Sequence, residues 1–126
     1  MTAMPISMDG SDPATWDGKL DGVLAAPGNH QVIYEDDSIR VVSVTIRPGE
    51  KEPVHHHRLP AVFVIDRLVK LRDFDAGGRE IPLPIPDKFD LPLIVKFPPQ
   101  PAHAVHNEDT ATFHATRIEF KRGFPS

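Results

Sequence analysis

The stretch Ile39-Arg40-Val41-Val42-Ser43-Val44-Thr45-Ile46 decides the fold class of this chain. It is rich in β-branched residues and alternates in polarity, which is the pattern of a half-buried strand. Residues 30–34 precede it across the polar break Glu35-Asp36-Asp37-Ser38, so the two segments form a predicted hairpin. The turn Arg47-Pro48-Gly49-Glu50 follows directly. The pattern therefore predicts antiparallel β structure.

Further short strands are predicted at 54–57, 61–71, 93–97, 102–107 and 113–121, and the segment 61–71 is expected to bend near Asp66-Arg67. Four prolines between 82 and 92 exclude a central strand there. With 14 prolines in 126 residues, long helices have few places to lie. Strands at this spacing without crossover helices predict an all-β sandwich or barrel.

The length fits a single domain. Residues 1–28 are expected to form an N-terminal arm, in which Asp12 is the N-cap of a short helix and Pro13 its first residue. The first ten residues are expected to be disordered or arm-like. Residues 29–122 form the predicted barrel, and residues 123–126 a tail.

Composition excludes several classes of function. Lys and Arg number 14 against 18 Asp and Glu, without a basic stripe, so we expect no nucleic-acid partner. The absence of cysteine excludes disulfides, iron–sulfur clusters and thiol nucleophiles. The longest apolar stretch, 61–65, is too short to cross a bilayer, so we expect no membrane partner. Residues 1–9 lack the features of a signal peptide, and we expect a cytoplasmic location.

Five of the seven histidines fall in two tight groups: His55, His56 and His57, then His103 and His106. His55 and His57 are two positions apart, so on a strand they point to one face and His56 points to the other. Imidazole is a common protein ligand for zinc, iron, copper and nickel. A third ligand must come from elsewhere, and His103 is the candidate. We therefore expect His55, His57 and His103 to bind one divalent ion (Fe, Mn, Zn or Ni).

The spacing around these histidines resembles the two sequence motifs of the cupin superfamily. The matching positions are Gly49, His55 and His57 in the first motif and Pro98, His103 and Asn107 in the second. The resemblance covers residues 30–121 and implies a small single-domain cupin with a jelly-roll barrel, the double-stranded β-helix. It also implies a homodimer, with the arm or the first hairpin crossing to the partner.

Two positions depart from the motifs. The glutamate of the first motif would fall at position 61 or 62, which are Ala61 and Val62, and the glycine of the second motif is Gln100. The metal shell that the resemblance implies is therefore three histidines. Three neutral imidazoles leave the ion its double charge and open coordination positions. The expected partner is a small anionic or chelating ligand, such as a carboxylate, a keto acid or a β-diketone.

The last predicted strand carries apolar residues on the face of His114, and we expect this face to be the inner one. It holds His114, Thr116, Ile118 and Phe120, whereas Arg117, Glu119 and Lys121 are expected to be solvated. The residues expected to line the substrate pocket are His114, Val62, Phe63 and Phe120. His114 is either a core histidine with satisfied hydrogen bonds or a contact to the ligand. His56 is expected at the surface or at an interface.

Three classes of function remain open. The first is a metal-dependent enzyme, in which Fe(II) would support a dioxygenase and Zn or Mn an isomerisation or hydrolysis. The second is a small-ligand binder or sensor without catalysis, and the third is a structural barrel whose site is vestigial. The sequence favours the first, a dioxygenase-like oxidoreductase.

Overall fold

The computed structural model describes residues 13–125. The disorder expected for residues 1–10 and the cap expected at Asp12 lie outside this range. The described chain begins with two 3-10 turns, η2 (Pro13–Thr15) and η3 (Gly18–Leu20), and the short helix α1 (Gly22–Ala25). No helix in residues 13–125 is long and apolar enough to span a membrane.

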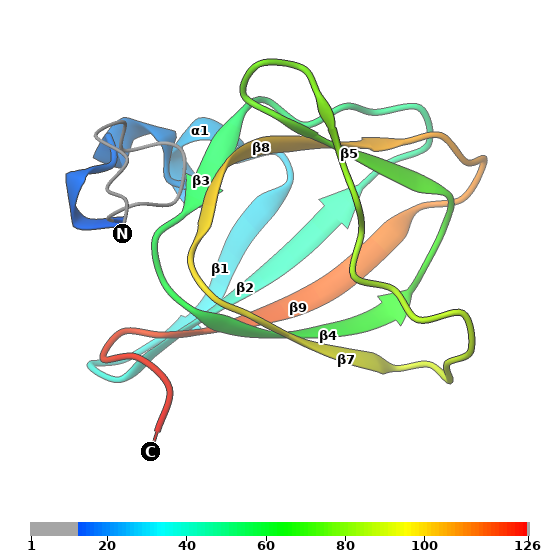
Figure 1. The fold of residues 1–126 in the computed structure, drawn as a ribbon. Coiled ribbons are helices and arrows are strands. Elements are labelled where there is room, and N and C mark those ends of the chain that lie inside the picture. Colours follow the sequence, from blue (N-terminus) through cyan, green and yellow to red (C-terminus); the bar gives the residue numbers. More distant parts are fainter. Residues whose placement is uncertain (1–12, 126) are drawn as a thin grey trace.

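Strands make up most of the rest of the described chain. They are β1 (His30–Glu35), β2 (Ile39–Ile46), β3 (His55–His57), β4 (Ala61–Arg67), β5 (Leu71–Asp75), β6 (Glu80–Ile81), β7 (Leu93–Phe97), β8 (Gln100–Asn107) and β9 (Phe113–Phe120). They form two antiparallel sheets that face each other, one with the order β1-β2-β9-β4-β7 and one with the order β3-β8-β5-β6 (Figure 1). The predicted all-β architecture is confirmed.

The single bent strand predicted at 61–71 is wrong, because this segment is two strands in different sheets. β4 ends at Arg67 and pairs with β7 and β9, whereas β5 begins at Leu71 and pairs with β6 and β8. A register shift between Ile65 and Arg67 interrupts the β4–β9 ladder. Bulges of this kind bend a strand and end its pairing, so the chain leaves the first sheet here.

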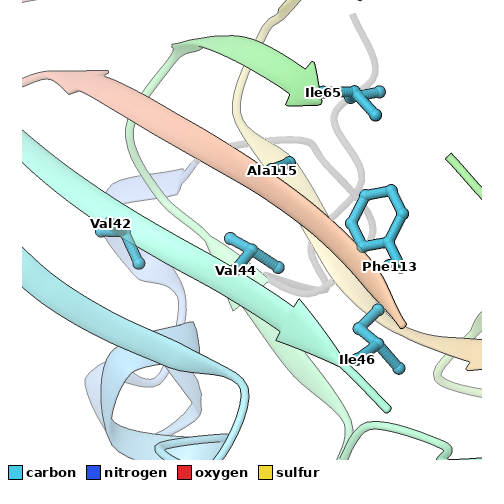
Figure 2. Packing of buried hydrophobic residues seen from close by; sticks show 6 residues of the cluster. All are labelled: Val42, Val44, Ile46, Ile65, Phe113 and Ala115. Carbon is cyan, nitrogen blue, oxygen red and sulfur yellow. The ribbon is translucent and has the colours of Figure 1, made fainter. Parts of the chain in front are cut away.

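The hydrophobic core lies on the inner face of the five-stranded sheet (Figure 2). Its buried members are Val42, Val44 and Ile46 of β2, Ile65 of β4, and Phe113 and Ala115 of β9. The alternation predicted for β2 is confirmed, since these three positions are buried and their neighbours are half-buried. Burial of each large apolar side chain contributes about 1.5–3 kcal/mol. The core therefore holds together the central strands of this sheet.

The inner face predicted for the last strand is wrong. β9 buries Phe113, Ala115, Arg117 and Glu119, and the last two have an exposed fraction of only 1% each. The opposite face of β9 carries Ile118, which lies between Val41 of β2 and Val62 of β4. These apolar neighbours explain why the outer face carries hydrophobic residues. Ile118 and Phe120, from which the inner face was predicted, therefore lie on the outer face of β9.

Candidate metal centre

A cavity of about 70 Å³ lies between the two sheets. Apolar side chains line much of it, among them Val44, Phe63 and Val95. Leu83 and Ile85, from the proline-rich connection between β6 and β7, add to this lining. Four histidines also line it: His30, His55, His57 and His103. The cavity therefore combines apolar walls with a cluster of imidazoles.

Three strands bring these histidines together. His55 and His57 come from β3, His103 lies opposite His55 on β8, and His30 is the first residue of β1. The centroid of the His55 ring lies 4.6 Å from that of His30, 4.9 Å from that of His57 and 4.8 Å from that of His103. His55 is thus the central ring of the cluster.

The N-terminal segment, which runs from η2 to α1 (residues 13–25), packs over the histidine cluster. Gly22 of α1 packs against it so closely that a Cβ there would lie 3.0 Å from His57 Cε1, 3.2 Å from His55 Cδ2 and 3.4 Å from His30 Cδ2. Any larger residue would displace these rings. Gly22 therefore allows the segment to close this side of the site.

His56 is fully buried, so the surface position expected for it is wrong. Its Nε2 lies 2.6 Å from the carbonyl oxygen of Asp17, and its ring packs at a tilt against Trp16, with the ring centroids 5.0 Å apart. Arg58 donates to the carbonyl oxygens of Pro13 and Trp16 at 3.1 and 2.7 Å. The N-terminal segment supplies partners for this face of β3.

Hydrogen bonds fix the tautomer of two histidines. His30 Nδ1 lies 3.0 Å from the carbonyl oxygen of Ala26, and His55 Nδ1 lies 2.7 Å from that of Pro53. A carbonyl oxygen only accepts, so each of these nitrogens carries the proton. In a neutral ring the Nε2 atom then has a free lone pair, which is the form that binds a metal.

His103 is oriented in the same way by a carboxylate. Its Nδ1 donates to Asp73 Oδ1 at 2.8 Å, which leaves Nε2 as the acceptor. Both His103 Nε2 and His55 Nε2 are buried, and within residues 13–125 neither has a hydrogen-bond partner. A carboxylate or carbonyl behind the ring is the usual arrangement of metal-binding histidines.

Burial keeps three of these histidines neutral. Desolvation lowers the pKa of His30 to about 4 and holds the pKa of His55 and of His57 well below its usual value. The rings are therefore uncharged at neutral pH.

Glu52 reaches the same cluster from the segment before β3. Its side chain is 2% exposed, and burial raises its pKa to about 8. Its Oε2 lies 3.6 Å from His30 Nε2, and its Oε1 lies 3.8 Å from His55 Nε2. Oε1 accepts the backbone N–H of Val105 at 3.1 Å, whereas Oε2 is buried without a hydrogen-bond partner among the described residues.

A buried charge network lies beside the cluster. Arg117 Nε donates to Glu119 Oε2 at 2.9 Å, and Arg40 bonds both to Glu119 and to Asp21 at the start of α1. Glu119 Oε2 also lies 3.9 Å from His57 Nδ1. The charges expected to be solvated at 117 and 119 are therefore paired with other buried or half-buried groups.

Gln100, which stands where the second motif has glycine, adds an amide to the cavity. It pairs with His57 across the β3–β8 ladder, and its Oε1 accepts from Arg117 Nη1 at 2.8 Å. Arg117 also lines the cavity.

The ligand atoms of His30, His55 and His57 lie within 4.8 Å of one another, and all three residues are buried. Neutral imidazole nitrogens suit the divalent ions of zinc, iron, nickel and copper. The residues present therefore fit a divalent ion. His55 and His57 belong to the set expected from the sequence, and His103 contacts both rings, with centroids at 4.8 and 5.5 Å.

Two residues of the cluster, His30 and Glu52, were not predicted from the sequence. His30 directly follows the turn at 26–29, and Glu52 precedes His55 by three positions. Neither position belongs to a motif. The one signal available was the closeness of Glu52 to the histidine triplet.

Of the four residues expected to line the pocket, Phe63 does so. Val62, His114 and Phe120 lie on the outer face of the five-stranded sheet, because each is one position out of register with the inward-facing residues. His114 bonds there to Ser43 Oγ at 2.9 Å and to Asp66 Oδ1 at 2.6 Å. The hydrogen bonds of His114 are therefore satisfied, as one of the two expectations had it, but the residue lies on the outer face of the sheet and not in the core.

No protein-family model and no curated protein matches this sequence. Solved structures do resemble the chain. A cupin domain from Bordetella pertussis Tohama I has a TM-score of 0.59 and 19% identity, over 73% of this chain and 91% of that one. A cupin family protein with a double-stranded β-helix fold from Methanocaldococcus jannaschii has a TM-score of 0.53 and 10% identity, over 72% and 77%. A protein with a double-stranded β-helix domain from Klebsiella pneumoniae has a TM-score of 0.52 and 17% identity, over 72% and 76%.

Proposed function

This chain has the cupin fold, as its sequence motifs predicted, and we propose that it binds one divalent metal ion through His55, His57 and His103. One observation carries the proposal. The Nε2 atoms of His55 and His103 are buried at the cavity without a hydrogen-bond partner in the described chain, while their Nδ1 atoms are held from behind. Buried polar atoms are rarely left without a partner, and a metal ion would satisfy both nitrogens.

The cavity supports a small ligand with an apolar body and an anionic end. Apolar side chains such as Phe63 and Val95 exclude water from much of the cavity. Beside Phe63, Arg117 has five N–H groups, of which Glu119, Gln100 and the carbonyl oxygen of Leu59 accept three. The remaining N–H groups favour a carboxylate or an enolate.

We propose a dioxygenase-like oxidoreductase acting on a small carboxylate, keto acid or diketone. A divalent ion at the histidines would polarise such a chelating substrate and, as iron, support its oxidation by dioxygen. Asp73 holds the His103 ring in place, and the apolar walls position the substrate. The alternative is a small-ligand binder without catalysis, which the full burial of His55 beneath the N-terminal segment favours.

The first test is the metal content of untagged protein purified without chelator. His57→Ala and His103→Ala should each lower the metal content several-fold. The matched control is His106→Ala, because His106 lies on the same strand as His103 and contacts Glu108 at 3.5 Å, away from the cavity. Equal metal content in wild type and in both cluster variants would refute the metal site.

The second test separates enzyme from binder. After Fe(II) loading, oxygen uptake is measured across a panel of small keto acids and diketones. Uptake that requires both iron and one class of substrate supports the enzyme. Binding of a panel member without any uptake supports the non-catalytic alternative.

A further inference from the structure

We propose that Glu52 supplies the anionic metal ligand that the chain lacks at positions 61 and 62. The inference rests on the proposed function, because it requires an ion at the histidine cluster. It assigns this ion a carboxylate from the segment between β2 and β3, on the N-terminal side of the histidine pair.

The backbone holds Glu52 at the cluster. Its N–H donates to the carbonyl oxygen of Val105 at 2.9 Å, and its Oε1 accepts the N–H of Val105 at 3.1 Å. Val105 is on β8, two positions after His103. The carboxylate is therefore fixed to the strand that carries one of the proposed ligands.

Glu52 faces two imidazoles that have no proton to offer it. His30 and His55 each use the Nδ1 proton for a backbone carbonyl, so their Nε2 atoms present lone pairs. The separations of 3.6 and 3.8 Å between these nitrogens and the Glu52 oxygens are too long for hydrogen bonds. When Glu52 is ionised, these acceptors face one another without a donor, and a cation between them would satisfy the carboxylate and both lone pairs.

The same separations approach those of two ligands on one ion. Ligands at 2.0–2.2 Å from a metal lie roughly 3.0–3.5 Å apart in tetrahedral or octahedral geometry. A shift of a few tenths of an ångström would bring Glu52 to that spacing with either ring. The buried Oε2 atom, which has no hydrogen-bond partner within residues 13–125, is the oxygen available for it.

The other positions and carboxylates near the cavity do not fit this role. Ala61 is buried but ends in a methyl group, and Val62 points to the outer face. Asp73 accepts from His103, and Glu119 is paired with two arginines. Glu52 is thus the carboxylate in the described chain that reaches the cluster with an uncommitted oxygen.

Glu52→Gln tests the proposal. Glutamine keeps the side-chain volume and the oxygen that accepts from Val105, so the variant should fold, but it removes the charge. With Co(II) as the probe, the Kd from chelator competition should rise at least about tenfold, the size that loss of even an outer partner of a metal site produces. The visible absorption spectrum of the Co(II) protein should also change.

The matched control is Glu50→Gln, two positions earlier. Glu50 bonds to Arg47 at the turn and does not line the cavity, so its variant should keep the wild-type Kd and spectrum. Glu52→Asp is the second variant, because it retains the charge on a shorter side chain. It should bind Co(II) more tightly than Glu52→Gln and gain more thermal stability from the metal.

Two results would overturn the inference in different ways. Wild-type Kd and spectrum in both Glu52 variants, with metal binding lost in His57→Ala, would remove Glu52 from the shell and leave the proposed function standing. No Co(II) binding by the wild-type protein would overturn the proposed function together with the inference.

Discussion

The inner face of β9 changes its chemistry halfway along the strand. Phe113 and Ala115 lie opposite Ile46 and Val44 of β2 in the hydrophobic core, whereas the next two inward positions belong to the charge network beside the histidines. Both halves are buried to the same degree. One buried strand face is thus maintained by apolar packing at one end and by paired charges at the other. The site lies at the charged end.

Disrupting the charged half of the inner face of β9 should cause the largest loss of stability. Glu119→Ala leaves Arg117 buried without its carboxylate, so the free energy of unfolding should fall by about 3–5 kcal/mol. The control is Glu80→Ala, which removes an exposed ion pair with Arg72 and should leave the free energy of unfolding nearly unchanged. Urea unfolding of both variants measures the difference, and equal losses would contradict the assignment of a buried network.

Disrupting the apolar half of the same face should lower the stability somewhat less. Ile46→Ala should lower the free energy of unfolding by about 2–5 kcal/mol, because it leaves a void in the core. Ile94→Ala, at a position 57% exposed on β7, should change it by about 0.5 kcal/mol or less. Comparison with Glu119→Ala then shows whether the two halves contribute equally. A loss from Ile46→Ala as small as that from Ile94→Ala would contradict the core described for β2 and β9.

The contrast between the two halves also explains what the sequence could predict. The alternation of β2 and the spacing of His55 and His57 depend on neighbouring residues, so both were accessible from the chain alone. The inner face of β9 was assigned from Ile118 and Phe120, on the assumption that charges face solvent. That assumption fails because Arg117 and Glu119 neutralise each other inside the barrel.

The third prediction tests the cover over the histidines. Gly22→Ala places a methyl group against three rings, which should cost about 1–3 kcal/mol of stability and weaken Co(II) binding. Gly28→Ala is the matched control, since a Cβ there meets nothing within 4 Å. Thermal unfolding with and without Co(II) measures both effects. If the two variants behave alike, α1 does not pack on the cluster.

The smallest effect on stability is expected when one of two similar carboxylate–histidine pairs is altered. Asp73→Asn weakens the hold on His103 and should raise the Kd for Co(II) about 10–100-fold, with little change in unfolding. Asp66→Asn alters the corresponding pair with His114 on the outer face, and metal binding should stay at the wild-type level. Equal Kd values in the two variants would show that the carboxylate of Asp73 does not support metal binding through His103.

The part of the site that the sequence did not reveal depends on contacts distant along the chain. His30 of β1 joins His55 of β3 where α1 packs against both strands, and Glu52 faces His55 only because its backbone pairs with Val105. No local sequence pattern predicts such long-range contacts. The motif spacing located the histidines of β3 and β8, and the fold added the rest.

The pairing of β2 with β9 has a consequence for how the chain folds. Ile39 lies opposite Phe120, so the central pair of the larger sheet joins segments from near the two ends of the barrel. Such distant pairing is slow to form, because the entropy of closing a long loop is lost before the contacts are gained. Until β9 is made, one edge of β2 is unpaired, and an unpaired strand edge is an aggregation hazard during synthesis. Loss of the last strand should therefore yield insoluble protein rather than a smaller barrel.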